Sequence, residues 1–245
     1  MHPTINQLSS PAEDPLKRKM PTLGILVLDT TFPRIPGDVG NIDTWPFPVK
    51  MRRVEGATPT RVTGPAVEQL LESFANGAQA LAQDGVCGIT TTCGFLAVLQ
   101  PRLAERSPVP FAASSLLQVP SVQATLPPGK RVGVITFSAE RLTAAHLTGA
   151  GAPPDTPCEG LSHDSLFYRM IIEGHDTIDT TQARRDVVSA GQQLISRHPE
   201  VGAIVVECAN MPPYSSALRE ALDLPIYDPV NFVQWFYASL LPRHF

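Results

Sequence analysis

Two of the four cysteines, Cys93 and Cys208, follow short apolar segments and precede helical patterns. A free thiol titrates near ~8.5, and a helix N-terminus lowers that pKa, so a strand-to-helix turn favours a usable thiolate. Such a thiolate can remove the weakly acidic proton beside a carboxylate, and a second thiol on the opposite face can return a proton. The pair therefore predicts a proton-transfer site. Cys87 and Cys158 lie inside predicted strands and are interpreted as packing residues.

The segments that must position these thiols alternate between short apolar runs and longer helical patterns, which is typical of α/β proteins with parallel sheets. The predicted strands span residues 23–28, 86–90, 109–113, 131–136, 158–161, 203–206 and 225–227. The predicted helices span residues 65–83, 95–104, 139–147, 182–196, 214–222 and 232–241. Open α/β sheets bind ligands at the carboxyl ends of their strands, so both cysteines fall at binding edges.

An internal repeat links the two cysteines. The segment Gly24-Ile25-Leu26-Val27 resembles Gly133-Val134-Ile135-Thr136, and the offset from position 24 to position 133 is 109 residues. From Cys93 to Cys208 the offset is 115 residues, which differs by only six. Two related βα halves would each present one thiol at a strand end. We therefore expect two facing lobes with both thiols in the cleft between them.

The domain boundaries follow from this repeat and from composition. We expect residues 1–20 to form a flexible leader, residues 21–115 plus 228–245 to form the first α/β lobe, and residues 116–227 to form the second. Residues 32–63 are rich in proline and glycine and predict a long ordered loop, either a lid or an oligomer contact.

Charge and composition exclude several classes of function. The formal net charge is −4, and no basic stripe with interleaved aromatic residues is present, so nucleic acid is not an expected partner. The longest apolar runs are far shorter than the ~20 residues that cross a bilayer, and the N-terminal segment lacks a secretory signal pattern. No CxxC pair and no metal-ligand spacing occurs. We expect a cytoplasmic protein with reduced thiols, no metal and no nucleotide cofactor.

The segments around the two cysteines resemble a known family. Thr90-Thr91-Thr92-Cys93-Gly94-Phe95 and Val206-Glu207-Cys208-Ala209-Asn210-Met211-Pro212, on duplicated halves, look like the aspartate/glutamate/hydantoin racemase superfamily. The resemblance implies two pseudo-symmetric flavodoxin-like lobes, no cofactor, and Cys93 and Cys208 as the proton-transfer pair. It also implies a homodimer or larger homo-oligomer. The residues that the resemblance implies for binding a substrate carboxylate are Asp29, Thr30, Thr92, Gly94, Thr136, Ser138, Ala209 and Asn210.

The expected activity is that of an isomerase, a racemase or epimerase that inverts the α-carbon of a small carboxylate, amino-acid or hydantoin-like, between two cysteines. Glutamate racemases typically have Asn-Thr after the first cysteine and Thr-His after the second, where this chain has Gly94-Phe95 and Ala209-Asn210. Phe95 and Met211 favour a less polar or larger acid. Arg34 and its neighbours in the proline-rich loop are interpreted as a solvated face, with contact to an anionic substrate as the alternative. Two other functions stay open: a maleate-isomerase-like or decarboxylating lyase, and a non-catalytic small-ligand binding protein.

Overall fold

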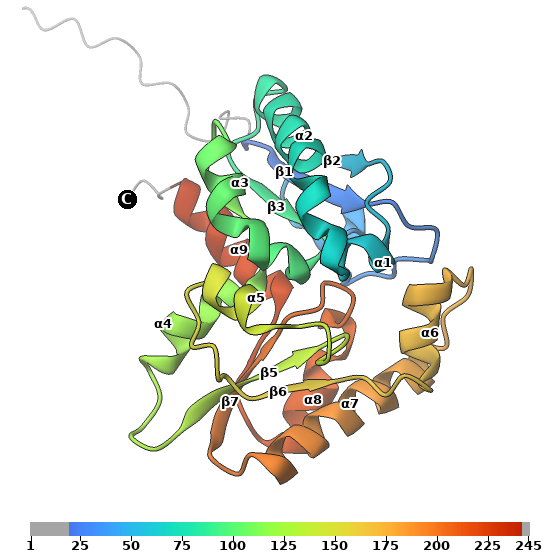
Figure 1. Cartoon of the computed structure of the whole chain (residues 1–245), viewed down its shortest axis with the longest axis vertical. Coiled ribbons are helices and arrows are strands. Elements are labelled where there is room, and N and C mark those ends of the chain that lie inside the picture. The colour runs from blue at the N-terminus through green and yellow to red at the C-terminus, as the bar shows by residue number, and fades with distance from the viewer. Residues whose placement is uncertain (1–19, 242–245) are drawn as a thin grey trace, which may run out of the picture.

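The computed structural model describes residues 20–241. Of the predicted leader, residues 1–20, only Met20 falls within the described residues, and residues 242–245 of the predicted first lobe lie outside them. Within the described part, two four-stranded parallel sheets are each flanked by helices (Figure 1).

The first sheet has the strand order β2-β1-β3-β4. Its strands are β1 (Leu23–Leu28), β2 (Val49–Val54), β3 (Ile89–Thr91) and β4 (Phe111–Ala112). The helices of this half are α1 (Pro59–Val62), α2 (Leu71–Gln83), α3 (Gln100–Arg106) and α4 (Val119–Gln123), with 3-10 turns η2 (Ile42–Thr44), η3 (Pro65–Leu70), η4 (Gly94–Leu99) and η5 (Ser115–Gln118).

The second sheet has the strand order β6-β5-β7-β8. Its strands are β5 (Arg131–Thr136), β6 (Cys158–Gly160), β7 (Val201–Val206) and β8 (Ile226–Tyr227). The remaining helices are α5 (Ala144–Gly149), α6 (Leu166–Glu173), α7 (Thr180–Arg197), α8 (Ser215–Leu222) and α9 (Pro229–Leu240), with the 3-10 turn η6 (Pro212–Tyr214).

The two sheets repeat the same strand pairing. Strand β1 lies between the edge strand β2 and β3, and β5 lies in the same way between the edge strand β6 and β7. The repeat extends to packing. A side chain at Gly24 would place its Cβ 3.0 Å from Leu81 of α2, and one at Gly133 would place it 2.8 Å from Leu194 of α7. Each glycine lets a helix lie directly on an inner strand. The predicted fold class, two pseudo-symmetric α/β lobes, is confirmed.

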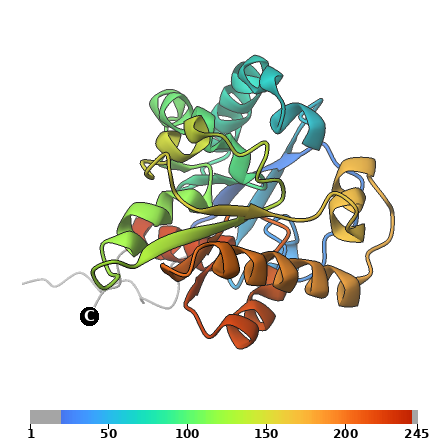
Figure 2. The ribbon, with the colours of Figure 1, turned by 60° about the horizontal axis from the view of Figure 1, so that its bottom comes forward.

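The C-terminal helix α9 returns to the first sheet. Leu23 and Ile25 of β1 share a buried cluster with Phe232, Val233 and Tyr237, whereas the alternate β1 residues belong to the main core. Parallel strands covered on both faces are buried throughout, which explains the continuous apolar run of β1. Figure 2 shows α9 beside the strands of the first half rather than with α7 and α8. The exact lobe boundaries stay a prediction.

The prediction of one long loop over residues 32–63 is wrong at β2. Lys50, Arg52 and Arg53 project outward from an edge strand that pairs in parallel with β1 along its whole length. Charged side chains are common on edge strands because they discourage pairing with other chains. Helix α6 was also absent from the predicted elements.

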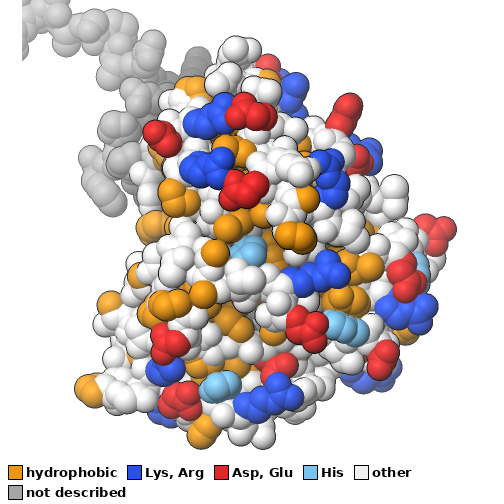
Figure 3. All heavy atoms as spheres, viewed as in Figure 1, with side chains coloured by type: hydrophobic (Ala, Val, Ile, Leu, Met, Phe, Trp, Pro, Cys, Tyr) orange, Lys and Arg blue, Asp and Glu red, His pale blue; other side chains and the backbone are white. Residues whose placement is uncertain are grey.

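The surface carries charges of both signs over both lobes on the face shown in Figure 3. Among residues 20–241, no helix is long and apolar enough to cross a membrane.

The fold predicts a large stability difference between two equal truncations. Leu81 of α2 is fully buried against β1. L81A should therefore lower the free energy of unfolding by about 2–5 kcal/mol, through lost burial and the cavity that remains. Leu166 is 49% exposed, so L166A should cost less than about 1 kcal/mol. Urea unfolding followed by circular dichroism measures both, and equal losses would contradict the packing described for α2.

Candidate functional site

Both cysteines lie at equivalent places in the two halves. Cys93 comes two residues after β3, and Cys208 comes two residues after β7. They line one narrow cavity of about 30 Å³ between the lobes. Its walls are largely apolar and include one arginine and one glutamate. The lining residues are Leu28, Phe32, Arg34, Pro59, Val62, Thr63, Thr92, Cys93, Gly94, Phe95, Phe137, Ile171, Glu207, Cys208, Ala209 and Asn210.

The backbone at Cys93 is extended, and this residue is the N-cap of η4. The hydroxyl of Thr91 accepts a hydrogen bond from the Cys93 N–H at 3.2 Å and donates to the Ala113 carbonyl at 2.8 Å. These bonds fix the end of β3 against the segment after β4, and so hold the thiol at the edge of the cavity.

Cys208 sits in a turn closed by a hydrogen bond from the Met211 N–H to the Cys208 carbonyl, 3.1 Å long. Its thiol donates to Asn210 Oδ1 at 3.7 Å. The Asn210 amide in turn donates to Asp38 Oδ2 at 2.6 Å, although 172 positions separate the two residues. The turn that carries the second thiol is thus tied to a loop of the first half.

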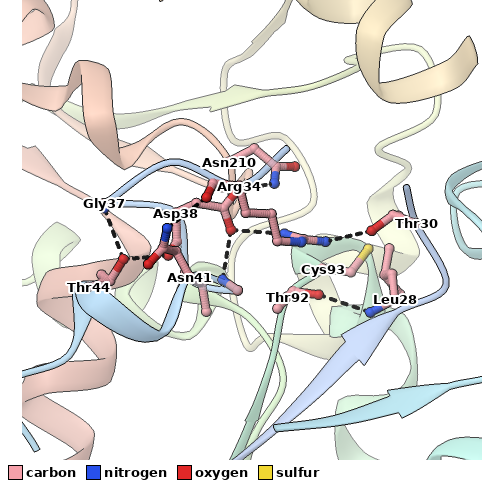
Figure 4. Close-up of polar contacts among 12 residues, drawn as sticks. Leu28, Thr30, Arg34, Gly37, Asp38, Asn41, Thr44, Thr92, Cys93 and Asn210 are labelled. Carbon is pink, nitrogen blue, oxygen red and sulfur yellow. Dashed lines mark hydrogen bonds and ion pairs between the residues drawn. The ribbon is translucent and has the colours of Figure 1, made fainter. Parts of the chain in front are cut away.

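That loop also positions the cavity's arginine. Arg34 pairs with Asp38 at 2.8 Å and donates to the Thr30 hydroxyl at 3.1 Å, and its guanidinium lies 4.9 Å from the centre of the Phe32 ring. Figure 4 shows the Arg34 side chain reaching from Asp38 toward Thr30, beside Cys93 and Thr92. The side chains of Arg34 and Asp38 are only 12% and 4% exposed. A guanidinium has five N–H donors, so these two contacts leave it able to bind an anion in the cavity.

A fully buried carboxyl group stands between the two cysteine turns. Glu207 Oε2 accepts a hydrogen bond from the Thr136 hydroxyl at 2.7 Å. Oε1 accepts none within the part of the chain that the structure describes. A Cβ at Gly94 would lie 2.2 Å from this oxygen, so only glycine fits beside it. Burial raises the pKa of Glu207 to about 7, although the hydrogen bond from Thr136 opposes the rise.

The protein environment makes Cys93 a weak acid in the closed cavity. Burial and, to a smaller extent, the charge of Glu207 raise the pKa of its thiol to about 12. The backbone N–H groups of Phe95 and Leu96 and the charge of Arg34 act in the opposite direction, because they stabilise a thiolate.

Cys208 has less support for a negative charge. Burial raises the pKa of its thiol well above the ordinary value, and the charges of Glu207, Cys93 and Asp38 add to that rise. A hydrogen bond from the backbone of Asn210 is the one contribution that lowers it. Of the two thiols, Cys93 is therefore the one whose surroundings better accommodate a thiolate.

The structure brings together some of the residues expected to bind a carboxylate. Thr92, Gly94, Ala209 and Asn210 line the cavity with the two thiols. Thr30 is adjacent, in a neighbouring hollow that shares Phe32, Pro59 and Ile171 with the cavity, and it is bonded to Arg34.

Three other expected ligands lie elsewhere. Asp29 lines only the neighbouring hollow, where its carboxylate is held by Arg53 and by the Gly56 N–H, so it repels rather than binds an anion. Thr136 does not line the cavity, and its hydroxyl donates a hydrogen bond to Glu207. Ser138 is buried outside the lining residues. The sequence grouped these three with the cysteines because all lie at or just after the carboxyl ends of β1 or β5, but their own side chains do not line the cavity.

The sequence prediction omitted Glu207 and placed Arg34 on a solvated face. A signal for Glu207 was present, since a charged residue directly after four apolar residues of a buried strand requires a special environment. Arg34 carried no such signal, because its burial depends on Asp38 and on contacts from the second half.

Curated proteins similar to this chain are named as lyases. The dimethylsulfoniopropionate lyase of Durusdinium sp. clade D is 29% identical over 238 residues, which cover 94% of this chain and 78% of that protein. Dimethylsulfoniopropionate lyase 5 of Emiliania huxleyi strain CCMP1516 is 27% identical over 91% of this chain, which spans only 46% of that longer protein. The expectation of an isomerase is therefore corrected, since it rested on a superfamily that also contains other reactions.

Solved structures of low sequence identity share the fold. A glutamate racemase isoform from Bacillus anthracis has a TM-score of 0.62 at 15% identity, covering 91% of this chain and 82% of that one. Arylmalonate decarboxylase has a TM-score of 0.58 at 17% identity, covering 90% of this chain and 92% of that one. These likenesses support the architecture alone.

The family assignment rests on a match along most of the chain. Residues 53–235, which include both cysteines and Glu207, match the model of the Asp/Glu/Hydantoin racemase family. The duplicated sheets and the shared thiol cavity are consistent with that match. The chain belongs to the Asp/Glu/Hydantoin racemase family.

Proposed function

We propose that this protein is a lyase that cleaves dimethylsulfoniopropionate, or a closely related acid with a sulfonium group on the β-carbon. The observation that carries the proposal is one cavity that combines a thiol pair, an arginine and three aromatic rings, in a chain similar over 94% of its length to a protein of that name. Each part of such a substrate has a counterpart in the cavity.

The substrate carboxylate would bind Arg34. This guanidinium is the cation among the cavity's lining residues, and its contacts with Asp38 and Thr30 hold it in place. Charge-assisted hydrogen bonds from a fixed guanidinium also stabilise the extra negative charge that develops on a carboxylate when the neighbouring carbon loses a proton.

The sulfonium end would lie against the aromatic rings of Phe95 and Phe137, away from Phe32, whose ring already faces Arg34. Ring faces attract cations, with estimates of about 0.5–2 kcal/mol for each ring depending on solvent exclusion. Apolar walls also suit the methyl groups of a sulfonium, and they suit the uncharged sulfide that leaves. A more polar wall would favour an ammonium group over a sulfonium.

The proton would be taken by Cys93. Its thiolate removes the hydrogen on the carbon next to the carboxylate, and that C–H electron pair becomes the new C=C bond. The bond from the β-carbon to sulfur breaks at the same time or directly afterwards, and sulfur leaves with that electron pair as dimethyl sulfide. Acrylate remains, and one proton passes to solvent when the thiolate forms again. Cys208 would donate a hydrogen bond to the charge that develops in this step.

Substitution of the thiols should separate these two roles. C93A should lower kcat by about 10³–10⁴-fold, because the base is removed, whereas C208A should lower it by about 10–100-fold through loss of a donor. The measurement is headspace gas chromatography of dimethyl sulfide together with proton NMR of acrylate. C87A removes a half-buried thiol outside the cavity and should leave kcat within about twofold.

The same assay, run in D₂O, tests the lyase assignment against a racemase. Deuterium incorporation into recovered substrate, with neither dimethyl sulfide nor acrylate formed, would overturn the lyase assignment. Release of carbon dioxide from an arylmalonate would point to the decarboxylating alternative instead.

Arg34 should matter for substrate binding more than for folding. R34M should lower kcat/KM by about 10–100-fold, mainly through a higher KM, and R34K should recover part of that loss. R106M removes an arginine that pairs with Glu72 on the surface, and it should change neither constant appreciably. Melting curves of all three variants separate lost binding from lost fold. Unchanged KM in folded R34M would contradict the assigned role.

A further inference from the structure

The buried carboxyl group of Glu207 has an oxygen that the fold does not use. Oε2 is bonded to Thr136, but Oε1 has no partner within residues 20–241. This oxygen lies against Gly94, the residue that follows Cys93 in the chain, and Glu207 itself precedes Cys208. A buried carboxylate oxygen with no hydrogen bond from the protein is costly, so its position beside the Cys93 turn calls for an explanation.

The ionisable groups around Glu207 come from four parts of the chain. They are Cys93 at the start of η4, Cys208 after β7, Cys158 on β6, and the Arg34–Asp38 pair of the loop after β1. The segments after β5 and η5 contribute neutral hydroxyl and backbone groups, Thr136 and Ser115 among them. Arg34 is largely compensated by Asp38, so Glu207 is the carboxyl group whose charge acts directly on both thiols.

We propose that Glu207 is the internal proton acceptor of the thiol pair: its carboxylate takes up the proton that Cys93 gives up when it becomes a thiolate. The proposal rests on the proposed role of Cys93 as the base. Glu207 does not touch the substrate in this arrangement, so it is a positioning residue that acts through Cys93.

The transfer is balanced without any other reagent. The S–H bond of Cys93 breaks, an O–H bond forms on Glu207, and the negative charge moves from the carboxylate to sulfur. The number of negative charges in the cavity stays the same, so no second charge has to be buried. After the thiolate has taken a proton from the substrate, Glu207 returns its own proton to solvent.

This arrangement predicts an unusual pH dependence of the thiolate. Below about pH 7 both groups are protonated, and the thiolate share falls with falling pH. Above about pH 7 the pair holds one negative charge, and its division between oxygen and sulfur no longer depends on pH. A lone thiol in the same place would instead gain thiolate tenfold per pH unit up to its own pKa.

Alkylation of the substrate-free protein by iodoacetamide tests the proposal, with the modified Cys93 peptide quantified by mass spectrometry from about pH 6 to about pH 9. In the unchanged protein the rate should rise up to about pH 7 and then change less than about threefold up to about pH 8, above which direct ionisation of the thiol beside the charged carboxylate takes over. In E207Q, which keeps the shape and the bond from Thr136, the rate should rise about tenfold per pH unit throughout. Equal slopes in the two proteins would overturn the proposal.

Two controls belong to the same samples. Cys87 is a half-buried thiol on which Glu207 has no influence, so its alkylation should rise about tenfold per pH unit in both proteins. E159Q alters a carboxyl that pairs with Arg197 outside the cavity, and it should leave the Cys93 profile unchanged.

A second variant decides the matter if E207Q does not fold. T136V removes the hydroxyl that stabilises the charged form of Glu207, so the break near pH 7 in the Cys93 profile should move upward by about one pH unit. A break that does not move would contradict the assignment.

The alkylation experiment uses no substrate, so its outcome is independent of the lyase assay. If the Cys93 profile is level above pH 7 but the protein does not cleave the sulfonium acid, the acceptor role of Glu207 is supported and the proposed lyase function is wrong. If the protein cleaves the sulfonium acid but its Cys93 alkylation profile equals that of E207Q, the lyase function is supported and the acceptor role of Glu207 is wrong.

Discussion

A carboxyl group held out of water between two thiols is the constraint on which this site depends. Burial shifts the pKa of Glu207 from 4.5 to about 7, so above that pH its charge opposes folding by about 3 kcal/mol, a cost that is absent below about pH 4.5. The surroundings reduce the cost where they can. Thr136 donates a hydrogen bond, and Gly94, without a side chain, leaves room for the carboxyl group.

The duplicated fold explains why both thiols meet, and its departures from symmetry explain why they differ. Thr92 and Glu207 hold the same position in the two halves, one residue before each cysteine. Thr92 accepts a hydrogen bond from the Leu28 N–H at the end of β1, and Glu207 accepts one from Thr136 at the end of β5. One half thus places a neutral hydroxyl beside its thiol, and the other places a carboxyl.

The sequence was sufficient for the features that depend on local pattern. The inner strands β1 and β5 begin and end as their apolar runs predict, and the strand-end cysteines share the expected cavity. It was insufficient where contacts between distant segments decide the structure. The charged edge strand β2 is a strand because β1 offers it a free edge, and Arg34 is buried because Asp38 is held by Asn210. The repeat indicated that the two thiols follow corresponding strands, but not that Asp29, Thr136 and Ser138 lie outside the cavity lining.

The unequal neighbours of the two thiols have a stereochemical consequence. A methylene group has two hydrogens that only a chiral environment distinguishes. In the proposed reaction, Arg34 fixes the carboxylate and Cys93 is the single base, so just one of those prochiral hydrogens would point at sulfur. The proposed cavity would therefore distinguish the two hydrogens even in an acid that has no stereocentre.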